Sequence, residues 1–134
     1  MLFRSGLGAL GVVTEITLDL LPTYSMQQNV YLNLSMEALE ANFEEIVSAA
    51  YSVSLFTRWQ NNTVDQVWLK SRVAQEPPLS LPNTFFGATA SPRPIHPIAT
   101  VPADSCTEQM GVPGAWQDRL PHFRMEFTPS HGEE

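Results

Sequence analysis

Residues 51–73, with the sequence YSVSLFTRWQNNTVDQVWLKSRV, decide the fold that we predict for this chain. Two runs rich in β-branched and aromatic residues, about 52–59 and 64–73, favour extended strands. Residues 60–63, with the sequence QNNT, separate these runs, and asparagine tolerates the left-handed backbone angles of a tight turn. The stretch therefore predicts a β-hairpin.

A strand and a helix are predicted just before this hairpin. Residues 24–34 alternate apolar and polar side chains, which predicts a strand. Ser35 is a good N-cap, and Glu37 lies in the first turn, where the helix dipole favours a negative charge. A helix over residues 36–50 follows, because its apolar side chains recur at helical spacing: Met36, Leu39, Phe43, Ile46, Val47 and Ala50. The order strand, helix, strand, strand indicates an α+β fold in which the helix covers one face of an antiparallel sheet.

The glycines near the N-terminus have the spacing G-x-G-x-x-G, at Gly6, Gly8 and Gly11. In a Rossmann fold such glycines follow one strand and open a helix that binds a pyrophosphate. Here residues 12–21 are rich in β-branched side chains and alternate with a period of two up to Pro22, which predicts a strand instead. The pattern therefore disfavours a Rossmann site and requires another reason for the glycines.

Composition excludes several classes of partner. The net charge of −7, from 7 basic and 14 acidic side chains, disfavours binding to nucleic acid or to an anionic membrane. No apolar run is long enough to span a membrane. Because Cys106 is the single cysteine, no internal disulfide can form, and we expect a reducing, cytoplasmic location.

The C-terminal half shows no regular period. Residues 74–121 hold nine of the 11 prolines, and we expect a long Pro-rich loop there, followed by a last strand over 123–128. The loop also contains apolar side chains that need a surface to cover, and we expect most of that surface to lie outside this chain. With the strand 12–21 lacking a predicted neighbour, both ends are interpreted as cuts through a larger protein.

Two stretches resemble a known family. Residues 5–24, SGLGALGVVTEITLDLLPTY, resemble the end of the FAD-binding domain of flavoprotein oxidases of the vanillyl-alcohol-oxidase type. The run from AAYSVSLFTRW through QVWLKSRV and HPI to CTEQMGVPGAWQDRLPHFRMEFTPSHGEE resembles the substrate domain of the alditol (xylitol) oxidases, relatives of the D-arabinono-1,4-lactone oxidases. The resemblance implies that residues 1–22 end a PCMH-type FAD-binding domain and that residues 23–134 form a partial substrate-binding domain.

The same resemblance implies a flavin contact near the start of the chain. Gly11, Val12, Val13 and Thr14 would line the FAD site, chiefly through main-chain N–H and C=O groups. Glycine at position 11 would permit a close backbone approach and unusual backbone angles. The alternative is that the glycines only shape a turn before a buried strand, and the sequence leaves both interpretations open.

The implied parent is an FAD-dependent oxidoreductase that oxidises a CH–OH group of an alditol or aldonolactone, with oxygen as acceptor and hydrogen peroxide as product. The family's flavin-attaching histidine lies upstream of the segment that matches this chain, and its polyol-contacting residues lie beyond the position that matches Glu134. We therefore expect no catalytic residue here and no activity of the isolated chain. A non-catalytic sugar-binding or interaction module, or an inactive truncated product, is the alternative.

The histidines and the cysteine do not form a recognisable reactive set. His96 lies between prolines and is expected to be a satisfied or exposed loop histidine. His122 and His131 lack the compact ligand spacing of a metal site, so no metal is expected. Cys106 has no nearby histidine or basic pair that would lower its pKa, so we do not expect a reactive thiol.

Charged and aromatic side chains give two further expectations. The charged groups near the C-terminus either form ion pairs where the loop docks or make a solvated rim: Glu108, Asp118, Arg119 and Arg124. Trp59 and Trp68 are expected to lie close together across the hairpin, as core residues rather than as a platform for a sugar. An exposed group of these two residues with Trp116 would favour the sugar-binding alternative.

Overall fold

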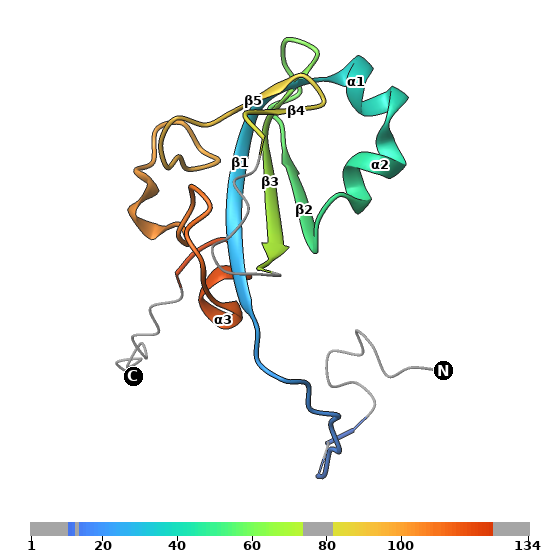
Figure 1. The fold of residues 1–134 in the computed structure, drawn as a ribbon, viewed down its shortest axis with the longest axis vertical. Helices are drawn as coiled ribbons and strands as arrows, with labels where there is room; N and C mark the ends of the chain where they lie inside the picture. The colour runs from blue at the N-terminus through green and yellow to red at the C-terminus, as the bar shows by residue number, and fades with distance from the viewer. Residues whose placement is uncertain (1–10, 13, 74–81, 125–134) are drawn as a thin grey trace.

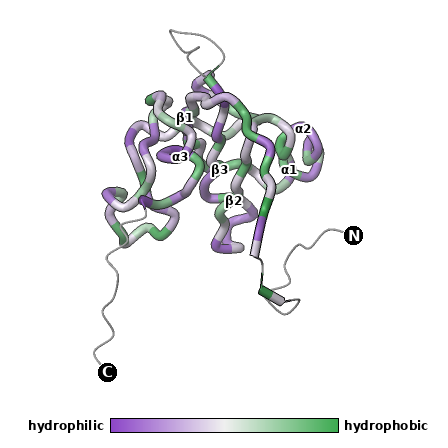
Figure 2. Tube along the Cα trace, turned by 90° about the horizontal axis from the view of Figure 1, so that it is seen from below, coloured by the Kyte–Doolittle hydropathy of each residue, from purple (hydrophilic) through white to green (hydrophobic). Residues whose placement is uncertain are grey.

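The computed structural model describes residues 11–12, 14–73 and 82–124 of the chain. Its core is an antiparallel sheet whose strands lie in the order β2 (Ser52–Phe56), β3 (Thr63–Arg72), β1 (Ser25–Ser35), β5 (Ala88–Ala90) and β4 (Thr84–Phe85). Strand β6 (Gly114–Ala115) pairs with β1 outside this path. Two short helices, α1 (Met36–Ala41) and α2 (Phe43–Ser48), lie on one side of the sheet, and the segment that contains α3 (Trp116–Arg119) lies on the other (Figure 1, Figure 2). An antiparallel sheet covered by a few helices confirms the α+β class at this coarse level.

The predicted strand 24–34 and the predicted hairpin are both confirmed. Strand β1 (Ser25–Ser35) pairs with β3 (Thr63–Arg72) from Met26 opposite Arg72 to Ser35 opposite Thr63. Strand β2 (Ser52–Phe56) pairs with the other edge of β3. In the turn, Asn61 and Asn62 adopt φ of 57° and 51°, the left-handed conformation that the QNNT sequence favours.

The predicted helix over 36–50 forms as two helices, α1 (Met36–Ala41) and α2 (Phe43–Ser48). The N-cap is as predicted, because the Ser35 hydroxyl accepts a hydrogen bond from the Ala38 amide at 3.0 Å. The helix is interrupted at Asn42, which has φ −130° and ψ 30°. The Asn42 side chain donates to the Ala38 carbonyl at 2.9 Å, so it competes with the helical backbone for this acceptor.

Each face of the sheet is buried by a different part of the chain. The helices cover an apolar cluster that includes Tyr31, Leu39, Ile46 and Val67. On the opposite face, Val30 and Trp68 pack with Cys106, Ile95 and Ala103 from the C-terminal segment. The middle of β3 is therefore buried on both faces, which explains why its residues from Gln66 to Lys70 are all buried.

The expectation that residues 74–121 lack regular structure is wrong for the described part of the range. The expectation that most of the surface for its apolar side chains lies outside this chain is not overturned, because five of the described ones stay exposed: Ile98, Val101, Met110, Val112 and Trp116. Residues 82–121 contain β4 (Thr84–Phe85), β5 (Ala88–Ala90), the 3₁₀ helix η1 (Ala103–Ser105), β6 (Gly114–Ala115) and α3 (Trp116–Arg119). The segment docks on the sheet through polar contacts as well as apolar ones. The buried Gln109 side chain bonds both main-chain groups of Ile95, at 3.1 and 2.8 Å, and the Gly111 amide donates to the Gln28 carbonyl at 2.9 Å.

The predicted strand over residues 12–21 is also wrong for the described residues of that range. None of them is in a strand, and their apolar side chains are exposed, among them Val12 at 91% and Leu20 at 90%. A strand requires a neighbour that pairs its backbone groups, and no described strand lies beside this stretch. Of the predicted strand 123–128, Phe123 makes an isolated antiparallel bridge with Cys106, and residues 125–128 lie outside the described residues.

Within the described part of the chain, no helix has the length and apolar character needed to cross a membrane.

Candidate functional site

The residues predicted to contact FAD lie in the exposed N-terminal stretch. Gly11 has φ of 126°, and a Cβ atom placed there would meet no described atom within 4 Å. Glycine is therefore required by the backbone angle and not by lack of space. Val12 and Thr14 are exposed, and Val13 lies outside the described residues.

A flavin contact fits what the structure shows at this stretch. Residues 11, 12 and 14 form no main-chain hydrogen bond with the other described residues. The positive φ of Gly11 is the unusual angle that the resemblance leads one to expect. The flavin contact itself stays a prediction.

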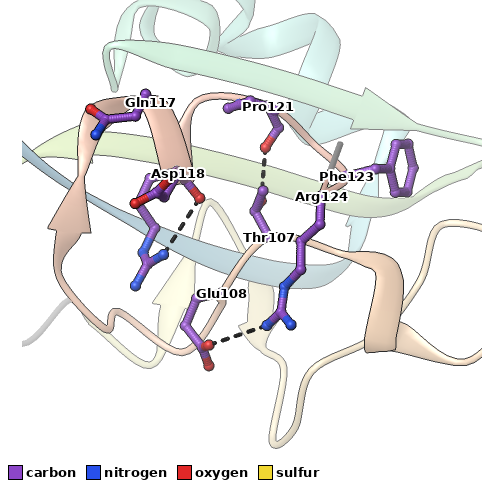
Figure 3. A pocket seen from close by; sticks show the side chains of 8 residues that line it. Thr107, Glu108, Gln117, Asp118, Pro121, Phe123 and Arg124 are labelled. Carbon is purple, nitrogen blue, oxygen red and sulfur yellow. Dashed lines mark hydrogen bonds and ion pairs between the residues drawn. The ribbon is translucent and has the colours of Figure 1, made fainter. Parts of the chain in front are cut away.

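A cavity of about 450 Å³ lies between the segment around Thr107 and the loop that follows α3. Figure 3 shows Arg124 reaching toward Glu108, and Thr107 next to the main-chain carbonyl of Pro121. The cavity brings together the four charged residues that the sequence analysis singled out. Its lining consists of Thr107, Glu108, Gln117, Asp118, Arg119, Pro121, Phe123 and Arg124.

These charged residues form one ion pair among the described residues that line the cavity. Arg124 Nη2 lies 3.6 Å from Glu108 Oε2, and both side chains are about half exposed. Arg119 instead donates to the carbonyls of Val112 and Pro113, at 3.2 and 3.3 Å. The Asp118 carboxylate has no ion pair or hydrogen bond to a described residue. The structure thus combines the two alternatives, with one docked pair and an otherwise solvated rim.

The loop behind this cavity is held by Lys70, which the sequence reasoning missed. Lys70 lies on β3 and is fully buried, and its Nζ donates to three consecutive carbonyls, those of Arg119 (2.6 Å), Leu120 (2.9 Å) and Pro121 (2.6 Å). The Thr107 hydroxyl donates to the same Pro121 carbonyl at 2.8 Å. Burial lowers the pKa of Lys70 to about 8. A sequence signal did exist, because this single lysine of the chain interrupts an otherwise uncharged stretch, QVWLKS.

His122 and Cys106 lie near Lys70 in the same interface. His122 Nε2 and Ser54 Oγ are 2.9 Å apart, and the imidazole stacks on the Trp68 ring at 5.5 Å between centroids. Burial, and to a lesser extent the charge of Lys70, lower the pKa of His122. Burial raises the pKa of the Cys106 thiol, so the cysteine is the inert group that the sequence predicts.

A second cavity, of about 340 Å³, lies next to His96 and Gln66. Gln66 joins β3 to the loop around His96. Its Nε2 donates to the His96 carbonyl at 2.9 Å, and its Oε1 accepts from the indole of Trp68 on the same strand at 2.8 Å. His96 Nδ1 accepts from the Ile98 amide at 3.0 Å. His96 is therefore a satisfied loop histidine, as predicted. Across the described residues, no three His, Cys, Asp or Glu side chains come together as a metal site would require.

The expected contact between Trp59 and Trp68 is wrong. Ser54 is the residue opposite Trp68 on β2, whereas Trp59 lies beyond the end of that strand with φ of 57°. Trp68 is fully buried, and Trp59 is 81% exposed. The three tryptophans therefore do not gather on one exposed surface, and the feature that would favour a sugar-binding module is missing.

An aromatic cluster that the sequence analysis did not anticipate lies at the other end of the sheet. Tyr24 stacks on Trp116 with 6.1 Å between ring centroids, and the Arg72 guanidinium lies over the rings of Tyr24 and Tyr51, at 4.1 and 4.9 Å. The Arg72 guanidinium therefore makes a cation–π contact with each of the two tyrosine rings, so the cation of this cluster is bound by its own aromatic side chains.

Comparison with known proteins bears on the whole chain. No protein-family model matches it. An alditol oxidase from a Streptomyces species (strain IKD472) is 48% identical to it over 130 residues. The chain is similar to a segment of an alditol oxidase. This confirms the resemblance drawn from the sequence. The match covers 97% of this chain but only 30% of the alditol oxidase, so the chain spans less than a third of that relative.

Proposed function

We propose that the chain is a segment of an FAD-dependent oxidoreductase that oxidises a CH–OH group of an alditol or an aldonolactone, with oxygen as acceptor and hydrogen peroxide as product. The single observation that carries this proposal is the 48% identity to an alditol oxidase over 97% of the chain. The substrate is a small polyol or sugar lactone, and the remainder of the parent protein is the partner of this segment.

The chemistry that such a cofactor supplies when bound is acceptance of a hydride from a carbinol carbon, followed by reoxidation by oxygen. The contribution we assign to this chain is limited to binding. The backbone at Gly11, Val12, Val13 and Thr14 would approach the flavin, which the positive φ of Gly11 supports. Residues 1–22 would end the FAD-binding domain, and residues 23–134 would belong to the substrate-binding domain.

A chimaera tests the proposal. The segment of the Streptomyces alditol oxidase that matches this chain is replaced by residues 1–134, and the unmodified oxidase is the control. We expect a yellow protein that releases hydrogen peroxide when alditols are added. A folded, flavin-loaded chimaera that forms no peroxide with any alditol or aldonolactone would contradict the proposed activity.

The flavin contact is tested separately in the same chimaera. Gly11→Val places a β-branched residue at φ of 126°, so we expect a displaced backbone and loss of most of the bound flavin, read from the visible absorbance per protein. Thr23→Val, an exposed position just beyond this stretch, is the matched control and should retain flavin. Equal flavin content in the two variants would remove Gly11 from the binding site.

A further inference from the structure

Two tyrosine side chains that are far apart in the sequence meet at their hydroxyl ends. Tyr24 lies directly before β1 and Tyr51 directly before β2, and the Tyr24 hydroxyl donates to the Tyr51 hydroxyl at 3.4 Å. The ring centroids are 6.1 Å apart, with an angle of 51° between the ring planes. Because the oxygens are closer together than the ring centres, the two rings converge toward their hydroxyl ends.

These converging ends carry the atoms that react when tyrosine is oxidised. A phenol that loses one electron and one proton becomes a phenoxyl radical, whose unpaired electron is shared between the oxygen and the ortho and para ring carbons. The para carbon of tyrosine bears the side-chain Cβ atom, so coupling takes place at an ortho carbon, which is bonded to the carbon that carries the oxygen. The ring torsion χ2 is broad, so the rings can tilt into the geometry for coupling. The pair therefore places two reactive positions next to each other.

The neighbouring side chains hold the two rings in this arrangement. The Arg72 guanidinium lies over both rings, 4.1 Å from the Tyr24 centroid and 4.9 Å from the Tyr51 centroid. Trp116 stacks on Tyr24 with 26° between the ring planes. Two reactants that are held in contact behave as if present at a very high concentration, so radicals formed here couple with each other before they meet another chain.

Tyr51 is the member of the pair that an external oxidant reaches and oxidises more readily. Its side chain is 53% exposed, whereas Tyr24 is half-buried. The hydrogen bond from Tyr24, followed by the Arg72 guanidinium, lowers the pKa of Tyr51, and the same hydrogen bond raises the pKa of Tyr24. A phenolate loses an electron more readily than a phenol, so oxidation begins at Tyr51.

We propose that Tyr24 and Tyr51 form an oxidative cross-linking site, which one-electron oxidation converts to an intramolecular dityrosine. Each tyrosine gives up one electron and one proton, a bond forms between the two ortho carbons, and each ortho hydrogen moves to its oxygen as the ring regains aromaticity. A haem peroxidase is the oxidant, and the two electrons and two protons reduce hydrogen peroxide to water. Peroxide is also the product of the proposed function, but the site itself needs only an external supply.

The cross-link would join residues that are 27 positions apart. The loop that it closes contains both α1 and α2, which cover one face of the sheet. Closing a loop removes conformations from the unfolded chain, as a disulfide does. The cross-linked chain should therefore unfold at a higher urea concentration than the untreated chain.

The test uses the dilute 134-residue chain with a haem peroxidase and hydrogen peroxide. The monomer isolated by gel filtration should acquire the fluorescence of dityrosine, and mass spectrometry should find the peptides that contain residues 24 and 51 joined, with the loss of two hydrogen atoms. Tyr24→Phe and Tyr51→Phe should each lower the dityrosine content of the monomer about tenfold, because the remaining tyrosine has no partner within reach. Each variant keeps the ring and removes only the hydroxyl.

The third tyrosine of the chain provides the matched control. Tyr31 is 1% exposed, and its hydroxyl donates to the Pro82 carbonyl at 2.9 Å. Tyr31→Phe should therefore leave the cross-link unchanged. If this variant does not fold, as judged by circular dichroism, the peptide map of the unmodified chain decides which tyrosines are joined.

Several outcomes would overturn the proposed site. Dityrosine found only in covalent dimers, a cross-link that includes Tyr31, unchanged fluorescence in folded Tyr24→Phe or Tyr51→Phe, or oxidation confined to the tryptophans would each do so. An unchanged urea midpoint of the cross-linked monomer would show that the bond does not constrain the segment between β1 and β2. Because the test supplies its own peroxide, its result does not depend on whether the chimaera is active.

Discussion

The Nζ atom of Lys70 lies 2.6 Å from the carbonyl oxygen of Pro121, 51 positions further along the chain. With the carbonyls of Arg119 and Leu120, this contact gives the ammonium group one acceptor for each of its three protons. One side chain on β3 therefore fixes the loop that forms the wall of the cavity. This single lysine joins the sheet to a segment that local sequence patterns leave without structure.

Replacing Lys70 by methionine should destabilise the chain strongly. The substitution keeps the length of the side chain but leaves three carbonyls without their buried donor, which we expect to cost about 3 kcal/mol of unfolding free energy at pH 7. Urea denaturation followed by circular dichroism measures this difference. Arg93→Met, which removes an exposed cation, is the control and should change stability by less than about 0.5 kcal/mol. Similar losses in the two variants would show that the three contacts contribute little.

Lys70 also predicts how stability depends on alkaline pH. Its pKa is lowered from 10.5 to about 8 in the folded chain, so between these values the unfolded chain binds more protons than the folded one. Stability contributed by this group therefore rises with pH in that window, by at most about 1.4 kcal/mol per unit. Cys106, whose pKa is raised, acts in the opposite direction. The difference between the unmodified chain and Lys70→Met isolates the lysine, and a difference that stays flat from pH 8 to 10.5 would contradict the assignment.

Because Lys70 is the single lysine, chemical labelling reports directly on its burial. In the folded chain the side chain is fully buried, so acetic anhydride should leave it unmodified. Full modification is expected when the same reaction is carried out in concentrated urea. Mass spectrometry of the peptide that contains residue 70 measures both. Rapid modification of the folded chain would mean that the loop after α3 does not stay docked.

Local signals in the sequence were sufficient to predict the strands β1, β2 and β3. Ser35 marks the helix start, and Asn61 and Asn62 mark the hairpin turn, because each acts on its own neighbouring backbone. The break at Asn42 is equally local, but the sequence analysis did not predict it. The helix was predicted from the spacing of apolar residues, and this spacing carries no information about a polar side chain that donates to the carbonyl four residues earlier.

The remainder depends on contacts between distant residues. The Gln109 side chain bonds the amide and the carbonyl of Ile95, as a neighbouring strand would. The Gln28 side chain donates to the Thr107 carbonyl, 79 positions away, at 3.4 Å. Such side-chain bonds leave no periodic pattern, so the docking of residues 82–124 could not be predicted. In residues 12–21 the reverse holds: the alternation is present, but pairing also needs a neighbouring strand. The sequence analysis named each charged residue that lines the cavity. It did not predict that they lie around one cavity, because this depends on the contacts of Lys70 with the loop after α3.

The two tryptophans of the hairpin should respond differently to substitution. Trp68→Phe removes the indole donor from Gln66 Oε1 and part of the stack on His122, so we expect a loss of about 1–3 kcal/mol. Trp59→Phe changes a side chain that is 81% exposed and should cost less than about 0.5 kcal/mol. Urea unfolding of both variants, followed by circular dichroism, decides the point. Equal costs would indicate that Trp59 is packed after all.

Two glycines with positive φ provide a matched pair for the docking of the C-terminal segment. Gly87 and Gly111 have φ of 86° and 71°, so alanine should cost about 1 kcal/mol at either position. At Gly111 the new Cβ would also lie 3.1 Å from the Asn29 side-chain oxygen, whereas at Gly87 it would meet nothing. Gly111→Ala should therefore be the more destabilising in thermal unfolding. If Gly87→Ala costs as much, the Asn29 side chain moves away from the new Cβ atom at position 111 with little loss of free energy.

His122 predicts a loss of stability in acid. Burial holds the pKa of its imidazole below the usual 6.5, so as the pH falls through 6.5 the unfolded chain takes up a proton before the folded chain does. The contribution of this group is fully present above pH 6.5 and declines as the pH falls below it. His122→Gln keeps a polar group beside Ser54 and removes the titration, so its unfolding free energy should fall less between pH 7 and pH 5 than that of the unmodified chain. Parallel curves would show that the imidazole is hydrated in the folded chain and that the stack on Trp68 opens.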